Sequence, residues 1–321
     1  MAGCAAAATP SSQSQSALGD GGAADLAGSV GGACVDGGSC STANAGACAL
    51  GHTVCAGGVE SCVPDVTTQG CYTGAAATRD VGACKSGKQT CIGALGSCDG
   101  QVLPAAQENC FNDLDDDCDG KVNNGCPDHL VTGTPRLLTA HGNAAGGSPF
   151  SLRCPANAYL TKIIVYAEKP STDGYDAGID IVCATPTLVR GVSTYSVTPV
   201  AVAASPSTIR GGNIDATLNA GFDCGATGFS PGWYAQYSSD PGGIDELGMS
   251  CAPGSLTLSA TNQLSVSFTK GGSLGVYGYA FGTASEDDCA ANEVLIGFDG
   301  RKGSWLDGLQ AVCAPLTVVY K

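Results

Sequence analysis

The sequence predicts an all-β protein whose carboxyl-terminal part is built from a threefold repeat, and three observations support this prediction. Three copies of one segment close on Cys-Ala, at Cys183, Cys251 and Cys313. These cysteines recur at intervals of 68 and 62 residues, which is typical of one supersecondary unit repeated along the chain. Apolar, β-branched and aromatic residues alternate with a period of two, and no run has the 3.6-residue period of a long helix. We therefore expect strands arranged with pseudo-threefold symmetry.

Each repeat carries two cysteines, so the sequence predicts one disulfide in each repeat. The opening cysteine stands 29, 27 and 24 positions before the closing one in the three copies. Clusters of Gly, Pro, Asp and Ser bound the β-branched runs, as they do around strands. We expect strands at residues 160–167, 195–202, 264–269 and 274–281, and opening half-cystines at Cys154, Cys224 and Cys289.

Aspartates occupy related places in the three copies. Asp245 and Asp307 both stand six positions before the closing cysteine, whereas Asp176 stands seven positions before it. A shared place in the repeat favours a shared turn role for these residues. That structural role is the alternative to ligand binding.

Three short motifs stand out in the same part of the chain. They are Cys-Pro-x-Asn at 154–157, Gly-Phe-x-Gly-Arg-x-Gly-x-x-x-Asp at 297–307, and Cys-Ala-Pro-Leu at 313–316 before a last strand. With these motifs, residues 130–321 resemble the β-prism proteins of the jacalin-like or vitelline-outer-layer type. The resemblance implies a pseudo-threefold β-prism head.

The resemblance also implies a carbohydrate site. In the jacalin family a Gly-x-x-x-Asp loop closes over a pair of sugar hydroxyls, and only the third repeat has this spacing, from Gly303 to Asp307. Trp305 lies between them and could stack on a sugar ring. The expected carbohydrate-binding residues are Gly303, Trp305 and Asp307.

Two further aromatic residues are candidates for sugar stacking. Tyr175 and Trp305 both stand eight positions before their closing cysteine, and Trp233 lies further upstream in the second copy. Exposed aromatic faces stack on sugars, whereas buried ones pack a core. The sequence leaves both roles open.

Composition restricts the range of partners. The chain of 321 residues has 48 glycines, only 14 lysines and arginines, and a formal net charge of −15. Nucleic acids and anionic lipids bind basic surfaces, so neither is an expected partner. Cations and neutral sugars remain. No run of 18 apolar residues is present, so no membrane-spanning helix is expected.

The amino-terminal residues resemble the start of a processed bacterial lipoprotein. Met1-Ala-Gly-Cys4 is similar to the end of a lipobox, in which the cysteine is lipid-modified. Without Cys4, the other cysteines number twelve before residue 130 and six after it, as paired half-cystines in an oxidising compartment would. Residues 1–33 contain no aromatic and few branched side chains and predict a disordered tether. We expect an outer-membrane lipoprotein at the cell surface, or a secreted protein; an incidental Cys4 in a disordered tail is the alternative.

Residues 34–127 form a cysteine-rich region. Two copies of Cys-x6-Cys-x6-Cys begin at Cys48 and Cys84, 36 residues apart. Gly57-Gly58 and Gly93 could adopt the positive φ of tight hairpin turns. We expect two bridged β-hairpin modules whose stability depends on disulfides, with the connectivity left open.

An Asp-rich loop follows the second module and predicts a calcium site. Its spacing matches the first eight positions of an EF-hand loop, with alternate carboxylates, a glycine at the turn (Gly120) and an apolar anchor (Val122). Cys126 replaces the glutamate of the twelfth position, so Asp113 or Asn123 would have to complete the ligand set. The expected metal ligands are Asp113, Asp115, Asp117, Asp119, Lys121 and Asn123.

The same segment resembles the MopE-type metal-binding motif of bacterial surface proteins, some of which are linked to copper. Copper sites prefer histidine, methionine or thiolate, and here the nearest histidine is His129. Calcium is therefore the expected cofactor. A solvated acidic turn without a cation is the alternative.

The predicted function is a calcium-binding bacterial surface protein with a carbohydrate-binding head. The alternative is a structural or adhesive subunit whose prism contacts proteins or other copies without a small ligand. No catalytic residue is expected: His52, His129 and His141 fall in expected loops, and the Gly-x-Ser-x-Gly run at 271–275 reads as a hairpin turn followed by a strand. The chain is therefore not expected to be an enzyme.

Overall fold

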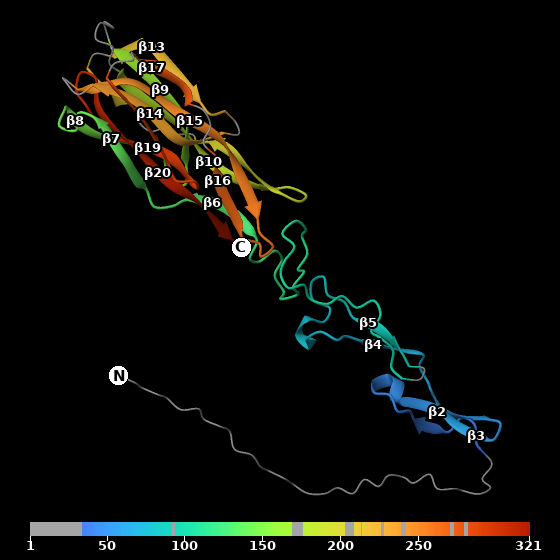
Figure 1. Cartoon of the computed structure of the whole chain (residues 1–321). Coiled ribbons are helices and arrows are strands. Elements are labelled where there is room, and N and C mark those ends of the chain that lie inside the picture. The colour runs from blue at the N-terminus through green and yellow to red at the C-terminus, as the bar shows by residue number, and fades with distance from the viewer. Residues whose placement is uncertain are drawn as a thin grey trace, which may run out of the picture. The chain divides into compact units, whose positions relative to one another are not determined.

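A computed structural model describes residues 34–321, apart from 92–93, 169–175, 203–208, 213, 226–227, 239–241, 270–272 and 279–281. The described residues form strands and two short 3-10 helices, which confirms the all-β prediction (Figure 1). They separate into two compact units, one of residues up to 70 with 88–97, the other of 71–87 with 98–321. No helix among the described residues is long and apolar enough to cross a membrane. Cys4, Gly93 and Tyr175 lie outside the described residues.

The first unit contains a small antiparallel sheet. Its strands β2 and β3 form the first expected hairpin, with φ of 61° and 82° at the turn residues Gly57 and Gly58. Three disulfides hold the unit, and one of them ties the two Cys-x6-Cys-x6-Cys copies together: Cys34–Cys55, Cys40–Cys62 and Cys48–Cys91. The elements are β1 (Ser39–Ser41), η1 (Gly46–Ala49), β2 (Leu50–Ala56) and β3 (Val59–Pro64).

The second expected hairpin is wrong for the described residues. In the second copy, β5 (Gly87–Thr90) pairs with β4 (Thr68–Cys71), which lies earlier in the chain. Contacts with the preceding segment hold β5 in place, because the N–H of Cys91 donates to the Thr67 carbonyl at 2.9 Å and Cys98 is bonded to Cys71 at the end of β4. The short helix η2 (Ala76–Thr78) lies between β4 and β5, and the other bridges of the region are Cys84–Cys118 and Cys110–Cys126.

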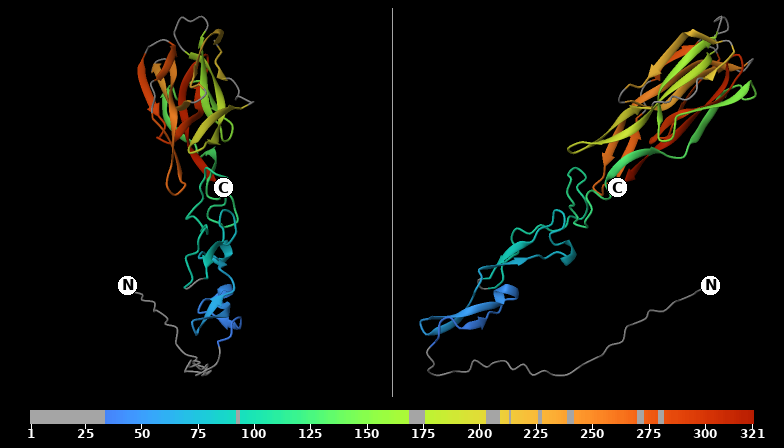
Figure 2. Two further views of the ribbon diagram at one scale, coloured as in Figure 1. Left: turned by 90° about the vertical axis from the view of Figure 1, so that its right-hand side faces the viewer. Right: turned by 180° about the vertical axis from the view of Figure 1, so that it is seen from behind.

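The head is a β-prism of three five-stranded antiparallel sheets, which confirms the pseudo-threefold prediction (Figures 1 and 2). Each sheet is built around one long hairpin whose second strand has 15 or 16 residues. The first two sheets contain β9 (Tyr159–Glu168), β10 (Asp176–Arg190), β11 (Tyr195–Ala201), β12 (Ile209–Arg210) and β13 (Ile214–Asp223), then β14 (Gly228–Ser238), β15 (Gly243–Leu258), β16 (Leu264–Phe268), β17 (Ser273–Gly278) and β18 (Thr283–Asp288).

The third sheet joins the two ends of the head. Its first strands precede the other sheets in sequence, and its long hairpin ends the chain, so the green strands lie beside the red ones in Figure 1. The elements are β6 (Pro127–Thr132), β7 (Arg136–Gly142), β8 (Ser148–Arg153), β19 (Glu293–Lys302) and β20 (Leu306–Tyr320). One disulfide spans each repeat, as predicted: Cys154–Cys183, Cys224–Cys251 and Cys289–Cys313.

Aliphatic and aromatic residues from all three sheets share one core. Trp233 of β14 is 1% exposed, and its ring centroid lies 5.5 Å from that of Phe298 in the third sheet. Trp233 is therefore a core residue, and its candidate role in sugar stacking is wrong. In residues 34–126, by contrast, the buried hydrophobic residues among those described are all cysteines.

The sequence analysis expected the three histidines to lie in loops, but all three lie in strands. His52, His129 and His141 lie in β2, β6 and β7. His141 is 6% exposed, its Nε2 bonds a carboxylate oxygen of Asp287 in the second sheet, and its ring lies 5.0 Å from that of Tyr237. His141 thus joins the second and third sheets through a long-range contact that local sequence does not encode. Ser273 opens β17, so the Gly-x-Ser-x-Gly run, expected to be a turn, enters a strand.

Reduction is expected to unfold residues 34–127 before residues 128–321. Each bridge contributes about 2 to 4 kcal/mol, and the cysteine-rich region has little apolar burial besides its bridges, whereas the head has a shared core. Limited proteolysis with and without dithiothreitol, read by mass spectrometry, would locate the first cuts. Early cuts between residues 130 and 321 would contradict this division of stability.

Candidate functional site

The Asp-rich loop brings three carboxylates together. Ligand oxygens of Glu108, Asp115 and Asp117 all lie within 4.8 Å of one another. Glu108 and Asp115 are only 3% and 4% exposed, and the Cys110–Cys126 bridge closes the segment that contains the two aspartates. Gly120, with φ of 92°, makes the turn that the sequence predicted.

Backbone amides donate to all three carboxylates, and Asp117 accepts the N–H of Asp119 at 3.2 Å. The Asp115 carboxylate accepts the N–H groups of Asp119 at 3.1 Å and Gly120 at 3.0 Å. Glu108 accepts the N–H groups of Asp117 at 3.3 Å and Asn123 at 3.1 Å. None of the three carboxylates belongs to an ion pair among the described residues. Three clustered anions with oxygen donors only are a donor set that suits a hard cation such as calcium.

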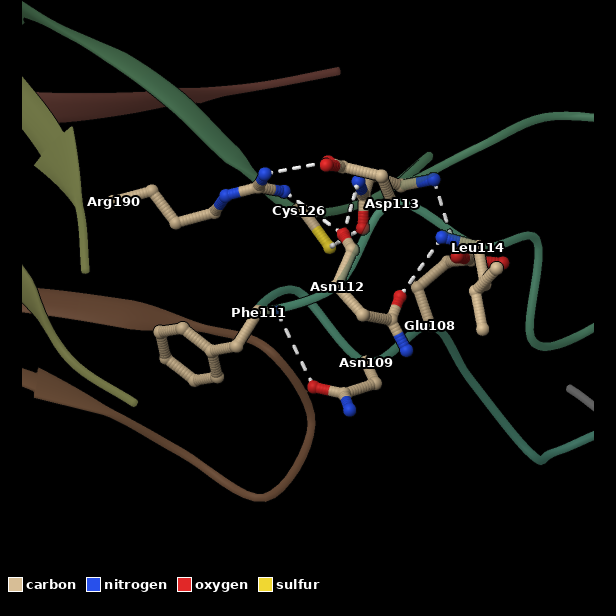
Figure 3. Close-up of polar contacts among 9 residues, drawn as sticks. Glu108, Asn109, Phe111, Asn112, Asp113, Leu114, Cys126 and Arg190 are labelled. Carbon is tan, nitrogen blue, oxygen red and sulfur yellow. Dashed lines mark hydrogen bonds and ion pairs between the residues drawn. The ribbon is translucent and has the colours of Figure 1, made fainter. Parts of the chain in front are cut away.

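The other predicted ligands lie differently. Asp113 points away from the cluster and pairs with Arg190 (Figure 3). Asp119 is exposed and accepts the N–H of Lys121 and the side-chain amide of Asn124, both at 2.9 Å. Lys121 is exposed, and Asn123 is buried with its side-chain amide donating to the carbonyl of Asn112 at 2.9 Å. The structure therefore groups Asp115 and Asp117 but not Asp113.

Glu108 is the residue that sequence reasoning missed. It lies seven positions before Asp115, outside the EF-hand spacing and before Cys110, the first cysteine of the bridge that closes the loop. The backbone carbonyl of Glu108 also accepts the Asn262 side-chain amide at 2.7 Å. Its low exposure and its two amide donors could be found only in the folded chain.

The loop is anchored to two hairpins of the prism, β10–β11 and β15–β16, and the contact with the second is the Asn262 amide described above. Arg190, at the end of β10, donates to the carbonyl of Asn112 at 2.9 Å as well as to Asp113. The Phe111 ring packs 5.4 Å from that of Tyr195 at the start of β11 (Figure 3 shows Phe111 and Arg190). The acidic cluster is therefore held by the head and not by flanking helices.

The expected sugar-binding residues lie in the tight hairpin between β19 and β20. The N–H of Gly303 donates to the carbonyl of Trp305 at 3.0 Å, and Trp305 is partly exposed. Asp307 is the extra residue of a β-bulge, because Gly308 pairs with Arg301 and Leu306 pairs with Lys302. The bulge turns its carboxylate beneath the neighbouring loop.

The Asp307 carboxylate is buried and has an open acceptor. The residue is 9% exposed, and its Oδ2 has no hydrogen-bond partner. Burial raises the pKa of Asp307, and the nearby Arg301 guanidinium opposes that rise. A Cβ on Gly147 would lie 2.3 Å from Oδ2, so the Gly147 backbone covers this oxygen. A ligand donor reaches Oδ2 only when this glycine segment moves aside.

The second repeat has the same bulge. Asp245 is its extra residue, 1% exposed, and accepts the Ser238 hydroxyl at 3.1 Å while its Oδ2 has no partner. Burial raises the pKa of Asp245 to about 6. In the first repeat the extra residue is Ala177, directly after Asp176. The place six residues before the closing cysteine is thus a bulge position in all three sheets.

Asp176 is the most strongly perturbed of these carboxyl groups. It is 1% exposed, and neither carboxylate oxygen has a hydrogen-bond partner. Burial raises the pKa of Asp176 well above its usual value, and repulsion from Asp245 and Glu246 adds to the rise. Protonation of Asp176 is therefore more favourable than that of an exposed aspartate.

These sheets and bridges define a disulfide-rich β-prism protein. No protein-family model matches the chain, and no curated protein sequence matches it significantly. Similar solved structures include Calystegia sepium agglutinin, at 16% identity and a TM-score of 0.37 over 58% of this chain and 99% of that chain. Single-chain recombinant jacalin is similar at 13% identity and a TM-score of 0.35, over 57% and 95% of the two chains. An artocarpin–mannotriose complex is similar at 13% and 0.33, over 59% and 99%. TM-scores this low carry no conclusion about what this chain binds.

Proposed function

We propose that the head binds carbohydrate at the third repeat through Gly303, Trp305 and Asp307. The observation that supports this proposal is the unpartnered Oδ2 of Asp307, which lies next to a glycine turn and a partly exposed tryptophan. A carboxylate oxygen of this kind can accept two sugar hydroxyls, and the Trp305 ring offers an apolar face. Because Gly146, Gly147 and Gly303 carry no side chains, only backbone atoms have to move aside for a sugar hydroxyl to reach Oδ2.

Asp307→Asn is expected to weaken sugar binding at least tenfold, because charge-assisted hydrogen bonds contribute about 1.5 to 3 kcal/mol each. A glycan array on the full chain would identify a bound sugar, and titration calorimetry would then compare the variant with wild type. Asp245→Asn is the matched control, since it changes the same bulge position in another sheet. If both variants bound the sugar as tightly as wild type and lost similar amounts of melting temperature, Asp307 would have a structural role. If no glycan on the array bound, the adhesive or structural alternative would be favoured.

The second part of the proposal is a calcium ion held by the Asp-rich loop. Glu108, Asp115 and Asp117 would supply carboxylate oxygens, and Asp119, Lys121 and Asn123 would contribute only after local rearrangement. Calcium would offset the repulsion among three clustered anions and would stabilise the turn at Gly120. Cys4, outside the described residues, would carry a lipid that tethers a bacterial surface protein, and the prism would face its glycan partners.

Calorimetry of the calcium-free full chain is expected to show one calcium site. Asp117→Ala and Glu108→Gln should each weaken binding at least tenfold, because each removes one of three clustered carboxylates. Asp113→Asn is the control, and its affinity should stay near that of wild type because Asp113 pairs with Arg190. Equal heats of calcium binding for wild type and Asp117→Ala would contradict the proposed calcium site. A large loss in Asp113→Asn would instead support the ligand set expected from the sequence.

A further inference from the structure

A groove of about 620 Å³ lies on the outer face of the third sheet. Its volume is within the roughly 300 to 1,000 Å³ range of small-molecule sites. Four strands line it, and the glycine at position 308 leaves its floor without a side chain. The principal lining residues are Ala140, Pro149, Ser151, Arg301, Gly308 and Gln310.

The corresponding faces of the other two sheets are covered by large side chains. Gly308 and its partner Gly142 in the third sheet correspond to Gly178 and Arg210 in the first. There the Arg210 guanidinium lies 4.4 Å from the centre of the Tyr166 ring, whose hydroxyl donates to Asp180 at 2.7 Å. The pseudo-symmetry of the backbone therefore does not extend to this surface.

The second sheet is covered in a similar way. Glu246 stands at the position of Gly308, five residues before its closing cysteine, and its carboxylate lies 3.3 Å from the Tyr234 hydroxyl. The same hydroxyl lies 3.2 Å from the side chain of Gln236. Of the three paired positions, which are all among the described residues, the third repeat alone has glycine on both strands. The open floor of this groove therefore depends on the residues of the third repeat and not on the backbone fold.

The polar groups of the groove suit a neutral ligand with several hydroxyls. Arg153 forms a double contact with Asp299 and neutralises it. The Gln310 amide nitrogen donates to the Leu138 carbonyl at 2.6 Å, and among the described contacts its oxygen has no donor. The Ser151 hydroxyl accepts from Arg153 at 3.3 Å and keeps its own proton available. Ala140 and Pro149 add exposed apolar surface, on which the C–H faces of sugar rings can pack.

The groove and the proposed sugar site share the loop between β7 and β8, whose Ala144 lines the groove. Arg301 lines the groove, and its guanidinium donates to the carbonyls of Gly146 and Gly147, to the latter at 2.8 Å. The same two glycines cover the Asp307 carboxylate, since a Cβ on Gly146 would lie 2.8 Å from the Asp307 Cβ. One loop therefore forms the end of the groove and the cover of Asp307.

We propose that the groove holds the inner residues of a neutral oligosaccharide whose terminal residue binds at Asp307. This inference rests on the carbohydrate-binding function proposed above and extends it from a single sugar to a chain of two to four residues. The groove supplies hydrogen bonds to sugar hydroxyls through Ser151 and Gln310, and Asp307 supplies the charged acceptor. Affinity then increases with chain length.

The test uses the full chain and a neutral glycan array, followed by titration with the mono- to tetrasaccharides that carry the best-bound terminal residue. Wild type is expected to bind the trisaccharide at least tenfold more tightly than the monosaccharide. Ala140→Trp and Ser151→Trp, on opposite walls, should each remove that gain and leave monosaccharide affinity unchanged. Thr139→Trp is the control, because Thr139 is an exposed neighbour on β7 that does not line the groove.

The outcomes separate the two proposals. If both wall variants still bind the trisaccharide more tightly than the monosaccharide, and Asp307→Asn abolishes binding, the groove proposal is overturned and the Asp307 site is supported. If the wall variants lose the tighter binding of the trisaccharide and Asp307→Asn keeps it, the groove proposal is supported and the Asp307 site is overturned. Two wall variants are used so that misfolding of one, visible as a lowered melting temperature, leaves the other to decide. An array without any bound glycan overturns both proposals.

Discussion

Trp233→Ala is expected to lower the free energy of unfolding of the head by about 3 to 5 kcal/mol. The side chain is 1% exposed and packs between the second and third sheets, against Phe298 at 5.5 Å and His141 at 5.4 Å. Truncation would leave a cavity that two sheets cannot both close without moving the shared core. Guanidinium denaturation followed by circular dichroism would measure the loss.

Trp305→Ala is the matched control for this experiment, because the chain has only these two tryptophans and Trp305 is partly exposed in a hairpin. Its loss should stay below about 1.5 kcal/mol. A larger loss for Trp305→Ala than for Trp233→Ala would contradict the assignment of Trp233 to the core.

The head is expected to be more stable at pH 5 than at pH 7.5, and Asp245→Asn should reduce this difference. A folded-state pKa of about 6 lies above the ordinary value of 3.8. The stability associated with protonated Asp245 is therefore fully present below pH 3.8 and is lost as pH rises through 6. Between pH 5 and 7.5 this amounts to about 1 to 1.5 kcal/mol.

Asp176 acts in the same direction, because burial and the repulsion of Asp245 and Glu246 also raise its pKa. Its contribution is likewise lost as pH rises, so Asp176→Asn should raise the melting temperature at pH 7.5. Glu293 acts in the opposite direction, since Arg136 lowers its pKa below 4.5, but that effect lies below the pH window used. Thermal melts of wild type and both variants at the two pH values would check the sign. A wild-type melting temperature that rises from pH 5 to 7.5 would show that these carboxyl groups do not control the pH dependence.

Much of the architecture could be predicted because it depends on local pattern. Period-two alternation predicted β9, β11 and β16 to within one or two residues of their ends. The repeated Cys-Ala positions predicted three equivalent disulfides and pseudo-threefold symmetry, and the resemblance to β-prism proteins predicted the prism of three sheets. Local patterns failed where a strand paired with an earlier segment, as in the second copy of the cysteine-rich repeat, whose strand β5 pairs with β4.

Only part of the candidate sites followed from motif spacing. Asp115 and Asp117 converge as the loop spacing predicted, but Glu108 completes the cluster from outside the motif, and Asp113 pairs with Arg190, 77 residues further along the chain. At the head, the spacing from Gly303 to Asp307 identified the hairpin. The glycine segment that covers Asp307 comes from the connection between β7 and β8 and carries no motif.

The amino-acid sequence by itself determined the strands, the threefold repeat and the disulfides of the head, because these depend on residue types at fixed short spacings within each repeat. Only the tertiary structure decided which side chains became buried or exposed at equivalent positions of the repeat. Gly308 opens a groove, whereas Glu246 fills the same place in the second sheet, and His141 is buried against Asp287 because two distant strands meet. The physical reason is that burial, charge repulsion and free volume depend on the neighbours that folding brings together, and those neighbours come from other sheets.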